Sequence, residues 1–97
     1  MAEVVVVAVA KCKDGEAERM RAVMSEVAAA SNEEEGCLSY VIHGDKNEPN
    51  RLVVVERWVS QEALNNHFTL PHTQKVGENI DALAEPPQIY FCEELPA

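Results

Sequence analysis

Hydrophobic residues recur along this chain at two spacings, which alternate in a regular order. Apolar stretches rich in valine and other strand-forming residues predict four β-strands. Apolar positions separated by three and four residues predict one helix from about residue 16 to residue 32 and a second helical region from 60 to 83. The four expected strands cover residues 3–12, 37–43, 51–59 and 88–95.

The resulting order, β-α-β-β-α-β, is the split arrangement of a ferredoxin-like α+β fold, in which helices cover one face of an antiparallel sheet. With 97 residues, the chain is expected to form one domain, residues 1–97. The first strand is apolar on both faces, since Val5, Val7 and Val9 alternate with other small apolar residues. We therefore expect a homodimer in which a second copy covers the free face of the sheet.

Polar residues interrupt this apolar pattern at one place. Alternation along the third strand puts Leu52, Val54, Glu56 and Trp58 on one face, so Glu56 is expected beside Trp58 in apolar surroundings. A buried carboxylate requires hydrogen-bond donors or a raised pKa. His67 lies on the inward face of the following helix and is expected to look into the same space. A cavity lined by these groups would suit a flat aromatic molecule.

Each of these residues also has a purely structural interpretation. Glu56 could tie the strand to the helix, and Trp58, His67 and Tyr40 could simply pack in the core. His72, which follows Pro71, could brace the interruption of the helix. The acidic run from Glu33 to Glu35 is expected to be a solvated helix end, with a docking surface for a cationic partner as the alternative.

No metal site is expected from the spacing of the histidines. His72 lies five residues after His67, whereas two ligands on one helix face are three or four residues apart. Even on an unbroken helix, the two side chains would diverge.

Composition narrows the classes of partner. A net charge of −9 works against binding to nucleic acid or to anionic membrane surfaces. The longest apolar run is far shorter than a membrane span requires. Three cysteines, Cys12, Cys37 and Cys92, form no CxxC pair and are expected to be small buried strand residues, which favours a reducing, cytoplasmic setting.

Several motifs, taken in order, resemble the antibiotic-biosynthesis monooxygenase family of dimeric α+β barrel proteins. They are an E-x-G-C signature within EEGCLSY (34–40), E-x-W within NEPNRLVVVERW (47–58), and A-L-x-x-H and P-H within SQEALNNHFTLPH (60–72). The resemblance extends over nearly the whole chain. The haem-degrading branch of the family fits poorly, because Ala8, Gly77 and His67 stand where its pocket asparagine, iron-ligating histidine and distinctive tryptophan would be.

The resemblance to the quinol-monooxygenase branch implies oxygenation of a quinol or polycyclic phenol by molecular oxygen without an organic cofactor. It implies His67 and Glu56 as catalytic residues, with His67 as the base and Glu56 orienting it or taking its proton. The pocket residues expected to bind the substrate are Trp58, Tyr40, His72 and Phe68, with Tyr40 donating to a substrate carbonyl.

Two other functions stay open at this point. One is an isomerase acting on a small carbonyl metabolite, with His67 as the proton shuttle. The other is a non-catalytic, dimeric ligand-binding or stress-associated domain. An anionic metabolite would require arginine or lysine in the pocket, whereas an aromatic substrate would require an apolar slot.

Overall fold

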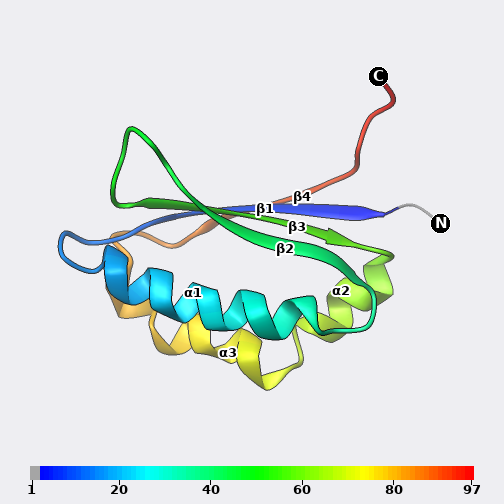
Figure 1. Cartoon of the computed structure of the whole chain (residues 1–97), viewed down its shortest axis with the longest axis horizontal. Helices are drawn as coiled ribbons and strands as arrows, with labels where there is room; N and C mark the ends of the chain where they lie inside the picture. Colours follow the sequence, from blue (N-terminus) through cyan, green and yellow to red (C-terminus); the bar gives the residue numbers. More distant parts are fainter. Residues whose placement is uncertain (1–2) are drawn as a thin grey trace.

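A computed structural model describes residues 3–97 and contains the expected elements in the expected order (Figure 1). The first helix ends at Asn32, close to the predicted position, and Gly36 in the turn that follows has a positive φ of 89°. The elements are β1 (Val4–Lys11), α1 (Ala17–Asn32), β2 (Cys37–Gly44), β3 (Arg51–Trp58), α2 (Gln61–His67), α3 (Pro71–Glu78), a 3₁₀ turn η1 (Ile80–Ala82) and β4 (Gln88–Cys92).

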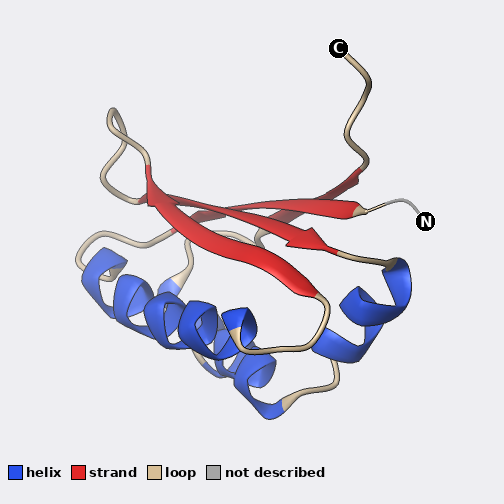
Figure 2. Ribbon diagram, turned by 45° about the vertical axis from the view of Figure 1, so that its right-hand side comes forward, coloured by secondary structure: helices blue, strands red, loops and turns tan. Residues whose placement is uncertain are grey.

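The four strands form one antiparallel sheet in the order β2-β3-β1-β4. All the helices lie on one side of it (Figures 1 and 2). The predicted ferredoxin-like α+β fold is therefore confirmed. The chain after β4 leaves the sheet on the side away from the helices (Figure 1).

The second helical region is interrupted before Pro71, as expected, and forms two helices. Ser60 caps α2, because its side chain accepts a hydrogen bond from the Ala63 N–H. Leu70 then has extended backbone angles, and Pro71 begins α3. The chain therefore changes direction between α2 and α3.

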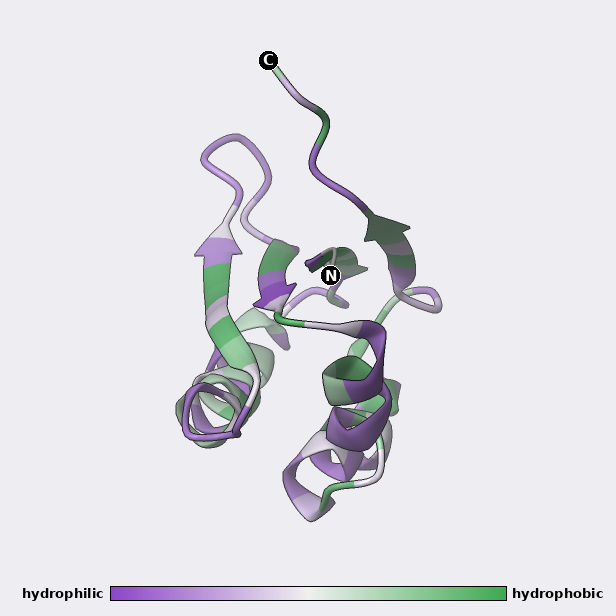
Figure 3. Ribbon diagram, turned by 90° about the vertical axis from the view of Figure 1, so that its right-hand side faces the viewer, coloured by the Kyte–Doolittle hydropathy of each residue, from purple (hydrophilic) through white to green (hydrophobic). Residues whose placement is uncertain are grey.

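The core lies between the sheet and the helices. Along β3, the predicted inward residues Leu52, Val54, Glu56 and Trp58 are all buried. Met20, Met24 and Val27 of α1 and Leu64 of α2 pack against this face. Apolar residues gather along the sheet and the inner sides of the helices (Figure 3). The alternation of period two therefore predicted the buried face of β3 correctly.

The opposite face of the sheet has no covering helix in the described chain. The register places Val7, Val55 and Val41 side by side across its centre, and Val41 is 47% exposed. Strand β4 is exposed on both faces, including Tyr90 and Phe91. This pattern leaves an apolar surface free for a further layer.

Candidate functional site

Glu56 and Trp58 form a buried pair on β3. They are two residues apart and point to the same side, and the Trp58 Nε1–H donates to Glu56 Oε1 at 2.9 Å. Burial raises the pKa of Glu56 to about 7, although the bond from Trp58 acts in the opposite direction. The Glu56 carboxyl can therefore exchange a proton close to neutral pH. Arg57 points to the other face of the sheet and pairs with Glu3 and Glu94.

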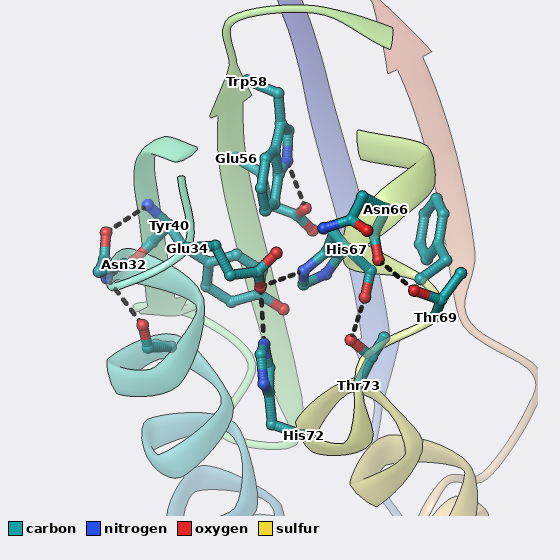
Figure 4. Close-up of polar contacts among 12 residues, drawn as sticks. Asn32, Glu34, Tyr40, Glu56, Trp58, Asn66, His67, Thr69, His72 and Thr73 are labelled. Atoms are coloured by element: carbon teal, nitrogen blue, oxygen red, sulfur yellow. Dashed lines mark hydrogen bonds and ion pairs between the residues drawn. The ribbon is translucent and has the colours of Figure 1, made fainter. Parts of the chain in front are cut away.

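His67 is fixed by Glu34, a residue that we had not predicted in the site. His67 Nδ1 lies 2.6 Å from Glu34 Oε2, and the two side chains are only 2% and 7% exposed (Figure 4). The expectation that Glu33–Glu35 is a solvated helix end is therefore wrong for Glu34. The expectation that Glu56 would orient His67 is also corrected, since Glu34 makes that hydrogen bond and Glu56 bonds to Trp58.

Gly36 explains how Glu34 reaches this position. The turn between α1 and β2 is held by backbone bonds from Glu34 N–H to Ser31 O and from Val59 N–H to Gly36 O. A Cβ atom added to Gly36 would lie 2.7 Å from the Cβ of Ala63 on α2. Because glycine has no side chain, the turn can approach α2 closely, and Glu34 is carried to the histidine.

His72 also reaches Glu34. Its Nε2 lies 2.6 Å from the same oxygen, Glu34 Oε2, and its side chain is 19% exposed. The expectation that His67 and His72 diverge is wrong, because it relied on helical geometry and the chain between them is not helical throughout. The extended residue Leu70 turns the chain back, and the Thr73 hydroxyl donates to His67 O at 2.6 Å and fixes the break. Both histidines consequently face one carboxylate (Figure 4).

A cavity of about 140 Å³ lies between the sheet and the helices beside this cluster. Its wall is mostly aliphatic and aromatic, and its ionisable side chains are those of Tyr40, Glu56 and His67. Phe68 and Ile89 line it and are both nearly half exposed, which places its opening between α2 and β4. The remaining lining residues are Ala8, Ala10, Met20, Met24, Leu52, Val54, Thr73, Val76, Leu83 and Pro87.

Tyr40 contributes a protonated hydroxyl to this cavity. The side chain is buried, and burial raises the pKa of Tyr40 well above its ordinary value, with the nearby Glu56 and Glu34 acting in the same direction. The phenol therefore stays neutral and can donate a hydrogen bond.

The aromatic rings surround the imidazole of His67. The ring centroids of Trp58, Phe68, Tyr40 and His72 lie 4.6, 5.4, 5.8 and 5.8 Å from it. The structure thus brings the six predicted site residues, His67 among them, into one region. Four of them, Tyr40, Glu56, His67 and Phe68, line the cavity, while Trp58 is fully buried and bonds to Glu56, and His72 bonds to Glu34.

The Glu34 cluster also has the composition of a metal-binding group. Glu34, His67 and His72 each offer one ligand atom, and these atoms lie within 4.8 Å of one another. The argument from helical spacing against a metal site therefore fails. Glu34 itself begins the E-x-G-C signature, and this motif was the signal that could have identified it from the sequence.

All three cysteines are free, but the prediction that they are buried holds only in part. Cys12 is buried and Cys37 is partly buried, whereas Cys92 is exposed at the edge of the sheet. Burial raises the pKa of Cys37 to about 11, and the charges of Glu34 and Glu56 act in the same direction. The Cys37 thiol is therefore protonated at neutral pH and a weak nucleophile.

Comparison with known proteins agrees with this fold. Residues 3–79 match the family model described as antibiotic biosynthesis monooxygenase. The uncharacterized protein sll1783 of Synechocystis is 32% identical over 80 residues, which cover 81% of this chain and 54% of that protein. The chain thus spans about half the length of this curated relative.

Solved structures share the fold over nearly the whole chain. PA3566 from Pseudomonas aeruginosa superimposes with a TM-score of 0.92 at 24% identity, covering 99% of this chain and 97% of that one. Rv0793 from Mycobacterium tuberculosis has a TM-score of 0.91 at 24% identity, with coverage of 99% and 98%.

The chain belongs to the antibiotic biosynthesis monooxygenase family. This membership confirms the resemblance seen in the sequence motifs. Within residues 3–97, no helix is both long and apolar enough to cross a membrane.

Proposed function

We propose that this protein is a cofactor-independent monooxygenase that oxidises a quinol or phenol with molecular oxygen. The observation that carries the proposal is the pairing of His67 with Glu34 at the wall of an apolar cavity. Membership of the family supports the reaction type.

In this proposal, His67 is the base. The Glu34 carboxylate accepts a hydrogen bond from His67 Nδ1–H, which leaves Nε2 of the neutral imidazole without a proton. Nε2 can then take the proton of a substrate hydroxyl, and the Glu34 carboxylate stabilises the imidazolium that forms. Because the phenolate is far richer in electrons than the phenol, it can transfer an electron directly to oxygen.

The other polar groups of the cavity have complementary roles. Tyr40 stays protonated and donates to the substrate oxygen that becomes a carbonyl. Glu56, with a pKa of about 7, supplies a proton to the oxygen atom that leaves as water. Phe68 packs against the substrate ring at the cavity opening.

Cavity size favours a small ring system. A volume of about 140 Å³ is close to that of the engineered protein cavity of roughly 150 Å³ that binds benzene. A single-ring quinol is therefore a better fit than a polycyclic phenol. Among residues 3–97, no arginine or lysine lines the cavity, which favours a neutral aromatic substrate over the anionic metabolite of an isomerase.

The reaction balances for a hydroquinone. One molecule of hydroquinone and one of oxygen give one hydroxyquinone and one water, so that one oxygen atom enters the ring and the other leaves reduced. The quinol loses four electrons and the oxygen molecule gains four. A simple oxidation would instead give a quinone and hydrogen peroxide.

The proposal is tested by oxygen uptake of metal-stripped protein with benzohydroquinones, naphthohydroquinones and anthrones. We expect uptake above autoxidation, fastest for the single-ring substrates, and a decrease in kcat of about 100-fold or more in His67→Ala, because general-base catalysis contributes that much. Equal uptake by the wild-type protein and His67→Ala would contradict the proposal. His43→Ala, which removes an exposed histidine outside the cavity, is the matched control.

A further inference from the structure

A second chemical capacity lies in the cluster of Glu34, His67 and His72, which meets His67 at Nδ1 rather than at Nε2, the nitrogen proposed as the base. Both histidines direct a ring nitrogen at a single oxygen, Glu34 Oε2, at 2.6 Å. The second oxygen, Glu34 Oε1, is buried and has no hydrogen-bond partner. A buried polar atom without a partner is costly, and it leaves an acceptor site available for a ligand.

From this geometry we propose that Glu34, His67 and His72 form a binding site for a divalent transition-metal ion of the Zn²⁺ class. Two imidazole nitrogens and one carboxylate oxygen are a donor set that such ions prefer, whereas Mg²⁺ and Ca²⁺ prefer oxygen ligands alone. The three ligand atoms come from three different parts of the fold, the turn before β2, the end of α2 and the start of α3, and lie within 4.8 Å of one another.

The change needed to admit an ion is small. Around a tetrahedral ion with bonds of 2.0–2.1 Å, neighbouring ligand atoms are about 3.3 Å apart. The nitrogen–oxygen distances of 2.6 Å must therefore open by less than about 1 Å. His72 can provide this movement, because its side chain is 19% exposed while that of His67 is 2% exposed.

The partial exposure of His72 also gives an ion a route to the site. An ion can approach from the His72 side, and water can complete its coordination there, as in sites with three protein ligands. Binding replaces the protons now shared between the carboxylate and the two rings, and Glu34 Oε1 gains a partner when the carboxylate turns toward the ion.

Metal binding would also alter the proposed base, a consequence that rests on the proposed function. An imidazole bound to a metal through Nδ1 carries its proton on Nε2, so Nε2 becomes a donor instead of an acceptor. A bound ion would therefore suppress deprotonation of a quinol. The metal site itself does not depend on this consequence, because it is tested by direct binding.

Isothermal titration with Zn²⁺ in the presence of excess Mg²⁺ tests the site. We expect one Zn²⁺ per chain in the wild-type protein and an affinity decrease of more than about 100-fold in His72→Ala, since loss of even an outer-shell partner costs 10–100-fold. His43→Ala should bind as the wild type does. Unchanged Zn²⁺ affinity in His72→Ala, or no saturable binding, would overturn the proposal.

Co²⁺ spectra of the wild-type protein provide a test that needs no variant. Ligation by two histidines and a carboxylate should give visible d–d bands of a four- or five-coordinate ion without the strong near-ultraviolet charge-transfer band of a thiolate. A strong thiolate band would show that a cysteine is a ligand and overturn the assigned ligand set. Absence of any d–d bands at saturating Co²⁺ would do the same.

Discussion

The site contains two buried carboxylates, Glu56 and Glu34, and their surroundings differ. Glu56 faces the apolar cavity with one donor, the Trp58 indole, and burial raises its pKa to about 7. Glu34 lies beyond His67 and holds two imidazole rings. Pairs of titratable groups in contrasting environments are typical of acid–base sites.

The raised pKa of Glu56 predicts a specific dependence of stability on pH. In the unfolded chain Glu56 ionises near pH 4.5, but in the folded protein it ionises near pH 7. The folded state therefore holds more protons between these values, and the contribution of Glu56 to the free energy of unfolding is present below pH 4.5 and lost as the pH rises through 7.

Glu56→Gln removes this contribution while keeping an oxygen for the Trp58 indole. Relative to the wild type, the variant should gain about 2 kcal/mol in free energy of unfolding between pH 5.5 and pH 8. Urea denaturation at the two pH values measures the difference. A constant gap between the two proteins would show that Glu56 ionises normally.

The positions of Glu34 and His72 in the site could not be predicted from the sequence pattern around each residue. The face of β3 followed from an alternation of period two, which correctly buried Glu56 and Trp58. Glu34 has no such pattern, because it lies in a turn and its burial comes from contact with a distant helix. Only its place in the E-x-G-C signature distinguished it from its acidic neighbours.

At the scale of elements, the site depends on how closely the turn before β2 approaches α2. Gly36 permits this approach through both its positive φ and its missing side chain. The break between α2 and α3 is the second requirement, since it returns His72 to Glu34. The sequence indicated the break through Pro71, but the direction of the chain after it depends on the extended backbone of Leu70.

Three glycine substitutions separate these effects. Gly36→Ala should lower the free energy of unfolding by more than about 2 kcal/mol, because it combines backbone strain with a clash against Ala63. Gly15→Ala has the same strained φ but open space around it, and should cost about 1–2 kcal/mol. Gly77→Ala lies in α3 with open space and should stabilise by up to about 1 kcal/mol.

Thermal and urea unfolding of the three variants measure these changes in the free energy of unfolding and so test their predicted order. If Gly36→Ala and Gly15→Ala cost the same, the close approach of the turn to α2 contributes nothing beyond the backbone angle. The explanation for the position of Glu34 would then be wrong.

At the scale of the whole molecule, we propose that two copies of the chain pack through the helix-free face of the sheet. This face presents a band of valines across three strands, with Val41 nearly half exposed. Strand β4 is exposed on both faces and also forms one side of the cavity opening. A second copy on the sheet would cover much of this apolar surface.

A charge placed at the centre of this face should prevent association. Val55→Lys is expected to shift the mass in sedimentation equilibrium from twice the 10.7 kDa of one chain to a single chain, because a lysine cannot be buried there without a partner. Ser25→Lys makes the same change of charge on the exposed side of α1 and should stay dimeric. A wild-type protein that sediments as a monomer would contradict the proposed interface.

The central claim is that His67, fixed by Glu34, deprotonates a quinol so that oxygen can attack it. The most direct measurement is the peroxide released per oxygen consumed when metal-stripped protein acts on a single-ring hydroquinone. Oxygen uptake that depends on His67, with hydroxyquinone as product and almost no peroxide, is the predicted result. One peroxide per oxygen, or the same ratio and rate in His67→Ala, would show that the protein does not catalyse monooxygenation through this histidine.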